Sequence, residues 1–135
     1  MNGAQDSSGM KYIYLMAGGA TGTLLRYLST IWISGNIMNF RFPWGTFFVN
    51  LTGCFVIGLL AGMNEHNNWN AEFKTFLFAG LLGGFTTYSS YALESLNLIR
   101  AGEFGLMFIY IASTTLIGLL LAFSGFYLGT QIIKN

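Results

Sequence analysis

Four long apolar runs, separated by short polar segments, dominate this sequence. Each run reaches the roughly 20 residues that a helix needs to cross the hydrocarbon core of a bilayer. Only 8% of the residues are charged, against about 25% in an average soluble domain. Because unpaired backbone groups are costly in lipid, helices are the credible spanning elements. We therefore predict an all-α membrane protein whose four transmembrane helices cover about residues 12–33, 44–63, 73–99 and 105–133.

The segments between the predicted spans are too short to be linkers between domains. The three segments read "SGNIMNFRFP", "NEHNNWNAE" and "RAGEF". We expect residues 1–135 to form a single four-helix transmembrane domain, with residues 1–10 as a disordered polar leader. This leader lacks the positively charged region of a signal peptide, so the first span is expected to stay in the mature protein.

Charge and composition exclude several function classes. The net charge is +1, and no basic cluster indicates a nucleic-acid partner. The sequence has no Cys/His cluster, paired-carboxylate site, nucleophile elbow or phosphate-binding loop, so we expect no enzymatic activity. The single cysteine, Cys54, excludes an intrachain disulfide. The expected surroundings are a lipid bilayer.

Pairs of small residues recur at a spacing of four in three of the spans. Such pairs allow membrane helices to approach closely, although glycine is also simply frequent in these helices. Four helices of this size leave little room for a pathway inside one subunit, so we expect an oligomer. The pairs are Gly18 with Gly22, Gly58 with Gly62, and Gly125 with Gly129.

The basic residues are almost evenly divided between the two sides of the predicted bundle. Lys11, Lys74 and Lys134 mark the side of the termini, whereas Arg41 and Arg100 mark the other side. Three against two is a very weak positive-inside bias. Near balance allows insertion in both orientations, and two opposed copies could then pair about a two-fold axis in the membrane plane.

The stretch "GLLGGFTTYSSY" interrupts the third span with glycines and hydroxyl side chains. Gly83 and Gly84 each lower helix propensity by about 1 kcal/mol. Nearby hydroxyls, such as those of Thr86 and Thr87, can bond the backbone groups that a break frees. We predict a broken helix here, with a kinked but unbroken helix as the alternative. Irregular backbone at membrane depth is tolerated only where it is buried in protein or lines a cavity.

Other polar residues lie inside the predicted spans. Asn50 lies early in the second span, and asparagine is rarer in membrane helices than serine or threonine. Arg26 and Glu94 carry charge into the first and third spans, where charge is costly and is usually functional or paired. An ion pair or an interfacial anchor is the simpler interpretation of these two. Hydroxyl side chains interrupt the fourth span at Ser113, Thr114 and Thr115.

Three stretches together resemble the bacterial fluoride channel family, also called Fluc or CrcB. They are "GGATGTLLRY", "GTFFVNLTGCFVIG" and "GLLGGFTTYSSYALE", and the resemblance extends over essentially the whole chain. It implies a fluoride-selective channel, built as an inverted homodimer of dual topology with two antiparallel pores, in the bacterial cytoplasmic membrane. It also implies a structural sodium ion at the dimer centre, held by backbone carbonyls that match Gly83 and Thr86.

The resemblance also implies the residues of the fluoride pathway. The pore aromatics of the family match Tyr88 and Tyr91, where the family usually has phenylalanine. A ring edge is electropositive in either residue. The family's span-one arginine matches Arg26. The remaining pathway residues implied are Asn50, Thr87, Ser89, Ser90, Ser113 and Thr114.

Two other functions remain open from the residues alone. A small proton-coupled multidrug exporter can also have four spans and an inverted dimer, but it needs a titratable carboxylate in its substrate pocket. The first span contains Arg26 and no acid, and Glu94 lies near a span end. A structural membrane subunit without transport is the third possibility.

Overall fold

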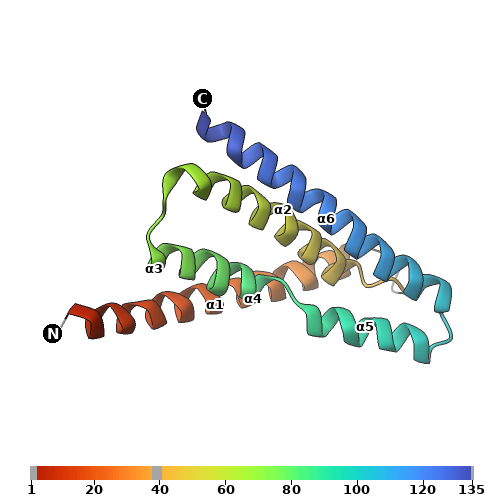
Figure 1. Cartoon of the computed structure of the whole chain (residues 1–135). Coiled ribbons are helices and arrows are strands. Elements are labelled where there is room, and N and C mark those ends of the chain that lie inside the picture. The colour runs from red at the N-terminus through yellow and green to blue at the C-terminus, as the bar shows by residue number, and fades with distance from the viewer. Residues whose placement is uncertain (1–2, 38–40, 135) are drawn as a thin grey trace.

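A computed structural model describes residues 3–37 and 41–134 of the chain. Within these ranges the chain is helical, apart from short connections. The termini and the connection between the second and third predicted spans lie at the left of Figure 1, and the far ends of α1 and α5 lie at the right. The elements are α1 (Gly3–Asn36), α2 (Trp44–Asn67), α3 (Ala71–Lys74), a π-helix η1 (Thr75–Leu82), α4 (Gly83–Phe85), α5 (Tyr88–Arg100) and α6 (Phe104–Lys134).

The first helix begins earlier than we predicted from the sequence. We expected a disordered leader over residues 1–10, whereas α1 already begins at Gly3. No proline stands in this part of the chain, so nothing in it prevents the helix from continuing past the apolar run. Residues 1 and 2 lie outside the described part of the chain.

Two of the described helices are long and apolar enough to cross a membrane by length and composition, namely α2 and α6. The third predicted span is divided among α3, η1, α4 and α5, of which α5 is the longest with 13 residues. The division follows the sequence, because glycines and hydroxyl residues gather in its middle.

The helices pack as two crossing pairs, α1 against η1 and α4, and α2 against α6 (Figure 1). Glycines line both crossings. An added Cβ at Gly58 would collide with the carbonyl oxygen of Ala122, and one at Gly125 would collide with that of Phe55. Gly22 faces the backbone of Leu81 in the same way. The small-residue pairs therefore pack helices together within one chain, which lets the backbones approach closely.

The turn between α5 and α6 brings the ends of these helices together. Gly102 has a φ of 75°, a left-handed conformation that glycine adopts without steric cost. The backbone N–H of Glu103 donates to the carbonyl of Leu98 at 2.9 Å, which closes the end of α5. Arg41 then reaches Glu103 across the chain at 3.2 Å. This tight connection folds α6 back beside α5.

Candidate functional site

The backbone leaves the helical conformation at Thr86 and Thr87, between α4 and α5. Thr86 has φ −81° and ψ 158°, and Thr87 has φ −148° and ψ 118°. Gly83 and Gly84, which prompted our prediction of a break, are themselves helical in α4. The extended residues thus follow the glycine pair. Two consecutive extended residues remove the carbonyls and N–H groups around them from the helical hydrogen-bond ladder.

The side-chain amide of Asn50, on α2, pairs with both backbone groups of Thr87. Its Oδ1 accepts a hydrogen bond from the Thr87 N–H at 2.9 Å, and its Nδ2 donates to the Thr87 carbonyl at 3.1 Å. Thr87 is only 8% exposed, so its backbone groups need partners inside the protein. Asn50 therefore supplies the partner that a helix would otherwise give to the Thr87 N–H, and it adds a donor to a carbonyl that also begins the hydrogen-bond ladder of α5.

The Thr87 side chain begins the next helix. Its Oγ1 accepts from the Ser90 N–H at 3.1 Å, which is the usual N-cap contact. The same oxygen lies 3.1 Å from Ser90 Oγ and 3.3 Å from Ser89 Oγ. The hydroxyls of Ser89 and Ser90 are thus gathered around the start of α5.

The carbonyl oxygens from Gly83 to Thr86 have no backbone hydrogen-bond donor among the described residues, and for two of them a side chain has taken the donor. In a continuous helix the Gly83 carbonyl would accept from the Thr87 N–H, but that group donates to Asn50. The Thr86 carbonyl would accept from the Ser90 N–H, which instead donates to Thr87 Oγ1. These neutral oxygens are the kind of ligand that suits a monovalent cation.

Three tyrosine rings form a ladder that runs from the surface into the protein. The ring centroids of Tyr88 and Tyr91 lie 5.7 Å apart, and those of Tyr91 and Tyr110 lie 5.2 Å apart. Tyr88 is 81% exposed in the single chain, whereas Tyr110 is completely buried. Such tilted pairs are favourable because the electropositive edge of one ring approaches the face of the next.

An open groove of about 380 Å³ runs along the break, and we call it the Asn50 groove. Gly53 lets the Thr86 side chain approach α2 in this groove, because a Cβ at this position would collide with the Thr86 methyl group. Of the predicted sodium and pathway residues, Ser89, Ser90 and Ser113 are not among its lining residues. The groove is lined by Asn50, Gly53, Cys54, Ile57, Phe78, Leu82, Gly83, Thr86, Thr87, Tyr88, Tyr91, Thr114 and Thr115.

The hydroxyls of the fourth predicted span bond to their own helix. Ser113 Oγ donates to the Ile109 carbonyl at 2.6 Å, and Thr114 Oγ1 donates to the Tyr110 carbonyl at 2.6 Å. A hydroxyl has one hydrogen to give. In this arrangement Ser113 and Thr114 therefore offer acceptor lone pairs to their surroundings, and they would have to rotate to serve as donors.

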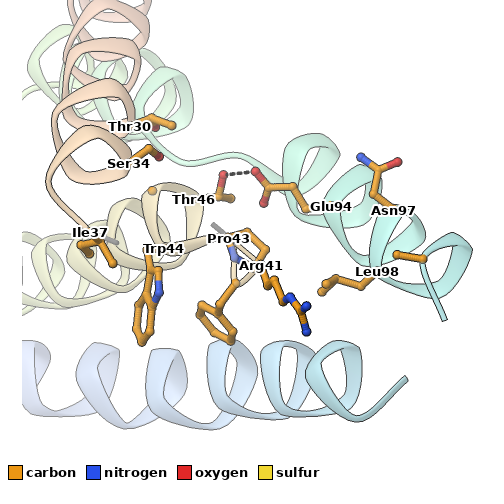
Figure 2. Close-up of a pocket in the computed structure, with 13 residues that line it drawn as sticks. Thr30, Ser34, Ile37, Arg41, Pro43, Trp44, Thr46, Glu94, Asn97 and Leu98 are labelled. Carbon is orange, nitrogen blue, oxygen red and sulfur yellow. Dashed lines mark hydrogen bonds between the residues drawn. The ribbon is translucent and has the colours of Figure 1, made fainter. Parts of the chain in front are cut away.

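A second cavity, of about 390 Å³, lies beside Glu94, and we call it the Glu94 pocket (Figure 2). Glu94 Oε1 accepts from the Thr46 hydroxyl at 2.7 Å, and Oε2 accepts from the Tyr110 hydroxyl at 2.8 Å. Figure 2 shows Thr46 and Glu94 turned toward each other, with Thr30 and Ser34 on the neighbouring α1. The lining also includes Ile37, Arg41, Phe42, Pro43, Trp44, Gly45, Asn97, Leu98 and Ala101.

The two charged residues predicted inside the spans are not joined to each other. Glu94 takes its hydrogen bonds from two neutral hydroxyls, and Arg26 makes no ion pair within the described part of the chain. Sequence reasoning missed Thr46 and Tyr110. A buried tyrosine hydroxyl needs a polar partner, so Tyr110, a tyrosine near the start of the fourth predicted span, was the available signal.

The comparisons with known proteins agree on one family. The sequence matches the family described as CrcB-like protein, Camphor Resistance (CrcB), over residues 13–126. It is 42% identical over 123 residues to a protein of Thermus thermophilus, covering 91% of this chain and 96% of that one. It is 40% identical over 121 residues to a protein of Bacteroides fragilis, covering 88% and 95% of the two chains. Both relatives bear the name "Fluoride-specific ion channel FluC".

Proposed function

The chain belongs to the CrcB-like family, and on this basis we propose that it is a fluoride-selective channel that lets the ion leave the cell passively. It is a membrane protein. The observation that carries the proposal is the Asn50 groove, where an irregular backbone, an amide and two tyrosine rings meet between membrane helices. The channel would lie in the cytoplasmic membrane of a bacterium.

The chemistry of the groove suits a small, strongly hydrated anion. A dry pathway must replace the hydrogen bonds that water gives to fluoride. The Asn50 amide and the ring edges of Tyr88 and Tyr91 are neutral groups that can do this. A deep ring of lysine or arginine would hold the ion too tightly for fast conduction. Among the residues lining the Asn50 groove there is no charged side chain.

The channel would be a homodimer of two copies in opposite orientations, with two antiparallel pores. The openness of the groove supports this assembly. Tyr88 is 81% exposed in one chain, although it stands beside the buried break in a membrane protein. A second, inverted copy would cover this ring and close the groove into a pathway. The near-equal numbers of basic residues on the two sides allow both orientations.

Efflux from proteoliposomes tests the function directly. Vesicles loaded with fluoride and carrying the purified protein are expected to release it down its gradient, without a pH gradient, as recorded with a fluoride electrode. Vesicles without protein give the background. Release that requires a pH gradient would favour a proton-coupled exporter, and no release from the folded protein would favour a structural subunit.

Forced orientation tests the dual topology. Two or three lysines added at one end of the bundle should bias insertion, because basic residues are retained on the cytoplasmic side. The biased protein is expected to be inactive when expressed alone and active when expressed with an oppositely biased copy. Full activity from one forced orientation would contradict the inverted dimer.

A structural sodium ion would join the two copies at the centre of the dimer. The carbonyls of Gly83 and Thr86, which accept no hydrogen bond from the described residues, fit this role. The absence of carboxylates among the lining residues of the groove favours a singly charged ion over magnesium or calcium. Exchange of sodium for a large organic cation is expected to weaken the dimer and lower the flux. Unchanged dimer stability and flux would contradict the assignment.

A further inference from the structure

We propose that Asn50 acts as a positioning residue, which holds the break open by pairing with the backbone of Thr87, in addition to facing the pathway. This inference rests on the proposed channel function. The amide bonds both the N–H and the carbonyl of one residue, at 2.9 and 3.1 Å. A side chain that served only as a donor to a passing ion would not need its oxygen directed at a backbone N–H.

The pairing uses most of the hydrogen-bonding capacity of the side chain. An asparagine amide has two N–H donors and a carbonyl acceptor. The acceptor serves the Thr87 N–H, and one donor serves the Thr87 carbonyl. The second Nδ2 hydrogen has no partner among the described residues. It is the hydrogen that Asn50 retains for an anion in the groove.

The pairing of Asn50 with Thr87 also affects the aromatic ladder, because Thr87 directly precedes it in the chain. Thr87 is the N-cap of α5, and Tyr88 is the first residue of that helix. If Thr87 lost its partner on α2, its buried N–H would be unsatisfied, whereas its carbonyl, as that of an N-cap residue, would still accept the first bond of α5. The segment would open to water to satisfy this N–H, which would rotate Tyr88 and Tyr91. Asn50 therefore sets the direction of both rings.

Amide exchange in the unmodified protein provides the first test. Site-resolved exchange by NMR in micelles should show the Thr87 amide protected, although Thr87 lies outside any helix. The amides of Tyr88 and Ser89, in the first turn of α5, have no acceptor among the described residues and serve as internal controls. Exchange at Thr87 as fast as at these two residues would overturn the proposal without any variant.

Substitution provides the second test. Asn50→Ala is expected to abolish the protection of Thr87 and to lower fluoride flux by about ten- to a hundredfold, because the buried Thr87 N–H loses its partner and the groove loses an amide donor. Loss of flux with full protection of the Thr87 amide would show that Asn50 acts only on the ion. Retained flux with lost protection would show that the pairing does not matter for conduction.

Asn50→Asp tests whether a side chain of the same size restores the pairing when it is protonated. An ionised carboxylate still accepts from the Thr87 N–H but repels the Thr87 carbonyl, whereas a protonated carboxyl can donate to that carbonyl. Flux through Asn50→Asp should recover by at least about fivefold as the pH falls from about 7.5 to about 5.5, relative to the wild type, because protonation restores the bond to the Thr87 carbonyl and also removes a negative charge from the anion path. The other titratable groups that line the groove are Cys54, Tyr88 and Tyr91, and all are present in both proteins.

Asn50→Ala is the matched control, because it has no group at position 50 to protonate and should not recover. Vesicles without protein correct for uncatalysed leakage at low pH. Equal pH profiles for Asn50→Asp and Asn50→Ala would contradict the proposal. If the wild type carried no fluoride but its Thr87 amide were protected by Asn50, the proposed channel function would be wrong. The proposed pairing of Asn50 with Thr87 would still hold.

Discussion

Two polar centres lie one helical turn apart along α2, and they differ in which group needs hydrogen-bond partners. At Asn50 the backbone is irregular, and a neutral side chain satisfies it. At Thr46 the backbone of the facing helix α5 is regular, and the group that needs partners is the carboxylate of Glu94. The first centre lies in the open Asn50 groove, and the second borders the Glu94 pocket.

The difference indicates which centre can donate a hydrogen bond to a passing anion. One Nδ2 hydrogen of Asn50 has no acceptor among the described residues, and the Tyr88 ring beside it is exposed. Both carboxylate oxygens of Glu94 accept from hydroxyls, and the Tyr110 hydroxyl is committed to it. Such charge-assisted bonds are short and strong. We therefore expect substitutions in the groove to change conduction first, and substitutions around Glu94 to change stability first.

The largest effect is expected from removing both contacts in the groove. The double variant Tyr88→Ile, Asn50→Ala should lose at least about a hundredfold in fluoride flux, since the dehydrated ion loses a ring edge and an amide donor together. Efflux from proteoliposomes measures this, after gel filtration shows that the variant remains a folded dimer. A folded double variant that conducts normally would place the pathway elsewhere.

Removal of the buried hydroxyl should come next. Tyr110→Phe leaves one Glu94 oxygen without its donor in a place where the tyrosine is completely buried. Bonds to charged groups contribute about 1.5–3 kcal/mol, so thermal unfolding in detergent should shift clearly downward. Tyr127→Phe is the matched control, because Tyr127 is exposed on the same helix. If the two variants were equally stable, the bond between Tyr110 and Glu94 would not stabilise the fold. The expected difference between the Glu94 centre and the groove would then be wrong.

Neutralising the carboxylate should have a smaller effect. In Glu94→Gln the side chain keeps its length, its Oε1 can accept from one hydroxyl, and the other hydroxyl can rotate to accept from the amide. We expect a loss of about 1 kcal/mol or less in the free energy of unfolding. A loss larger than that of Tyr110→Phe would mean that the charge itself, rather than the pattern of hydrogen bonds, stabilises this centre.

The smallest effect is expected from the hydroxyls of Tyr88 and Tyr91, the two outer rings of the ladder. Tyr88→Phe and Tyr91→Phe keep the ring edges, so each variant should retain flux within about twofold of the wild type. Parallel measurement of Tyr88→Ile tests the ring itself. Failure of the two phenylalanine variants would instead assign the anion contact to the hydroxyls.

Several features of the site follow from local sequence, and others do not. Gly83, Gly84 and the hydroxyl residues after them place an interruption in the third span, because each acts on its own stretch of backbone. The same pattern does not say that Gly83 and Gly84 stay helical while Thr86 and Thr87 extend. That outcome depends on Asn50, 37 residues before Thr87 in the chain, which stabilises the extended form.

The sequence by itself determined the membrane character, the four apolar runs and the family, since these depend on composition, run length and motif. Only the tertiary structure decided the partners of the polar groups. It joined Glu94 to Thr46 and Tyr110 rather than to Arg26, and it turned the small-residue pairs inward. The physical reason is that hydropathy is a property of each segment, whereas a hydrogen bond between helices requires their crossing to bring two particular atoms within about 3 Å.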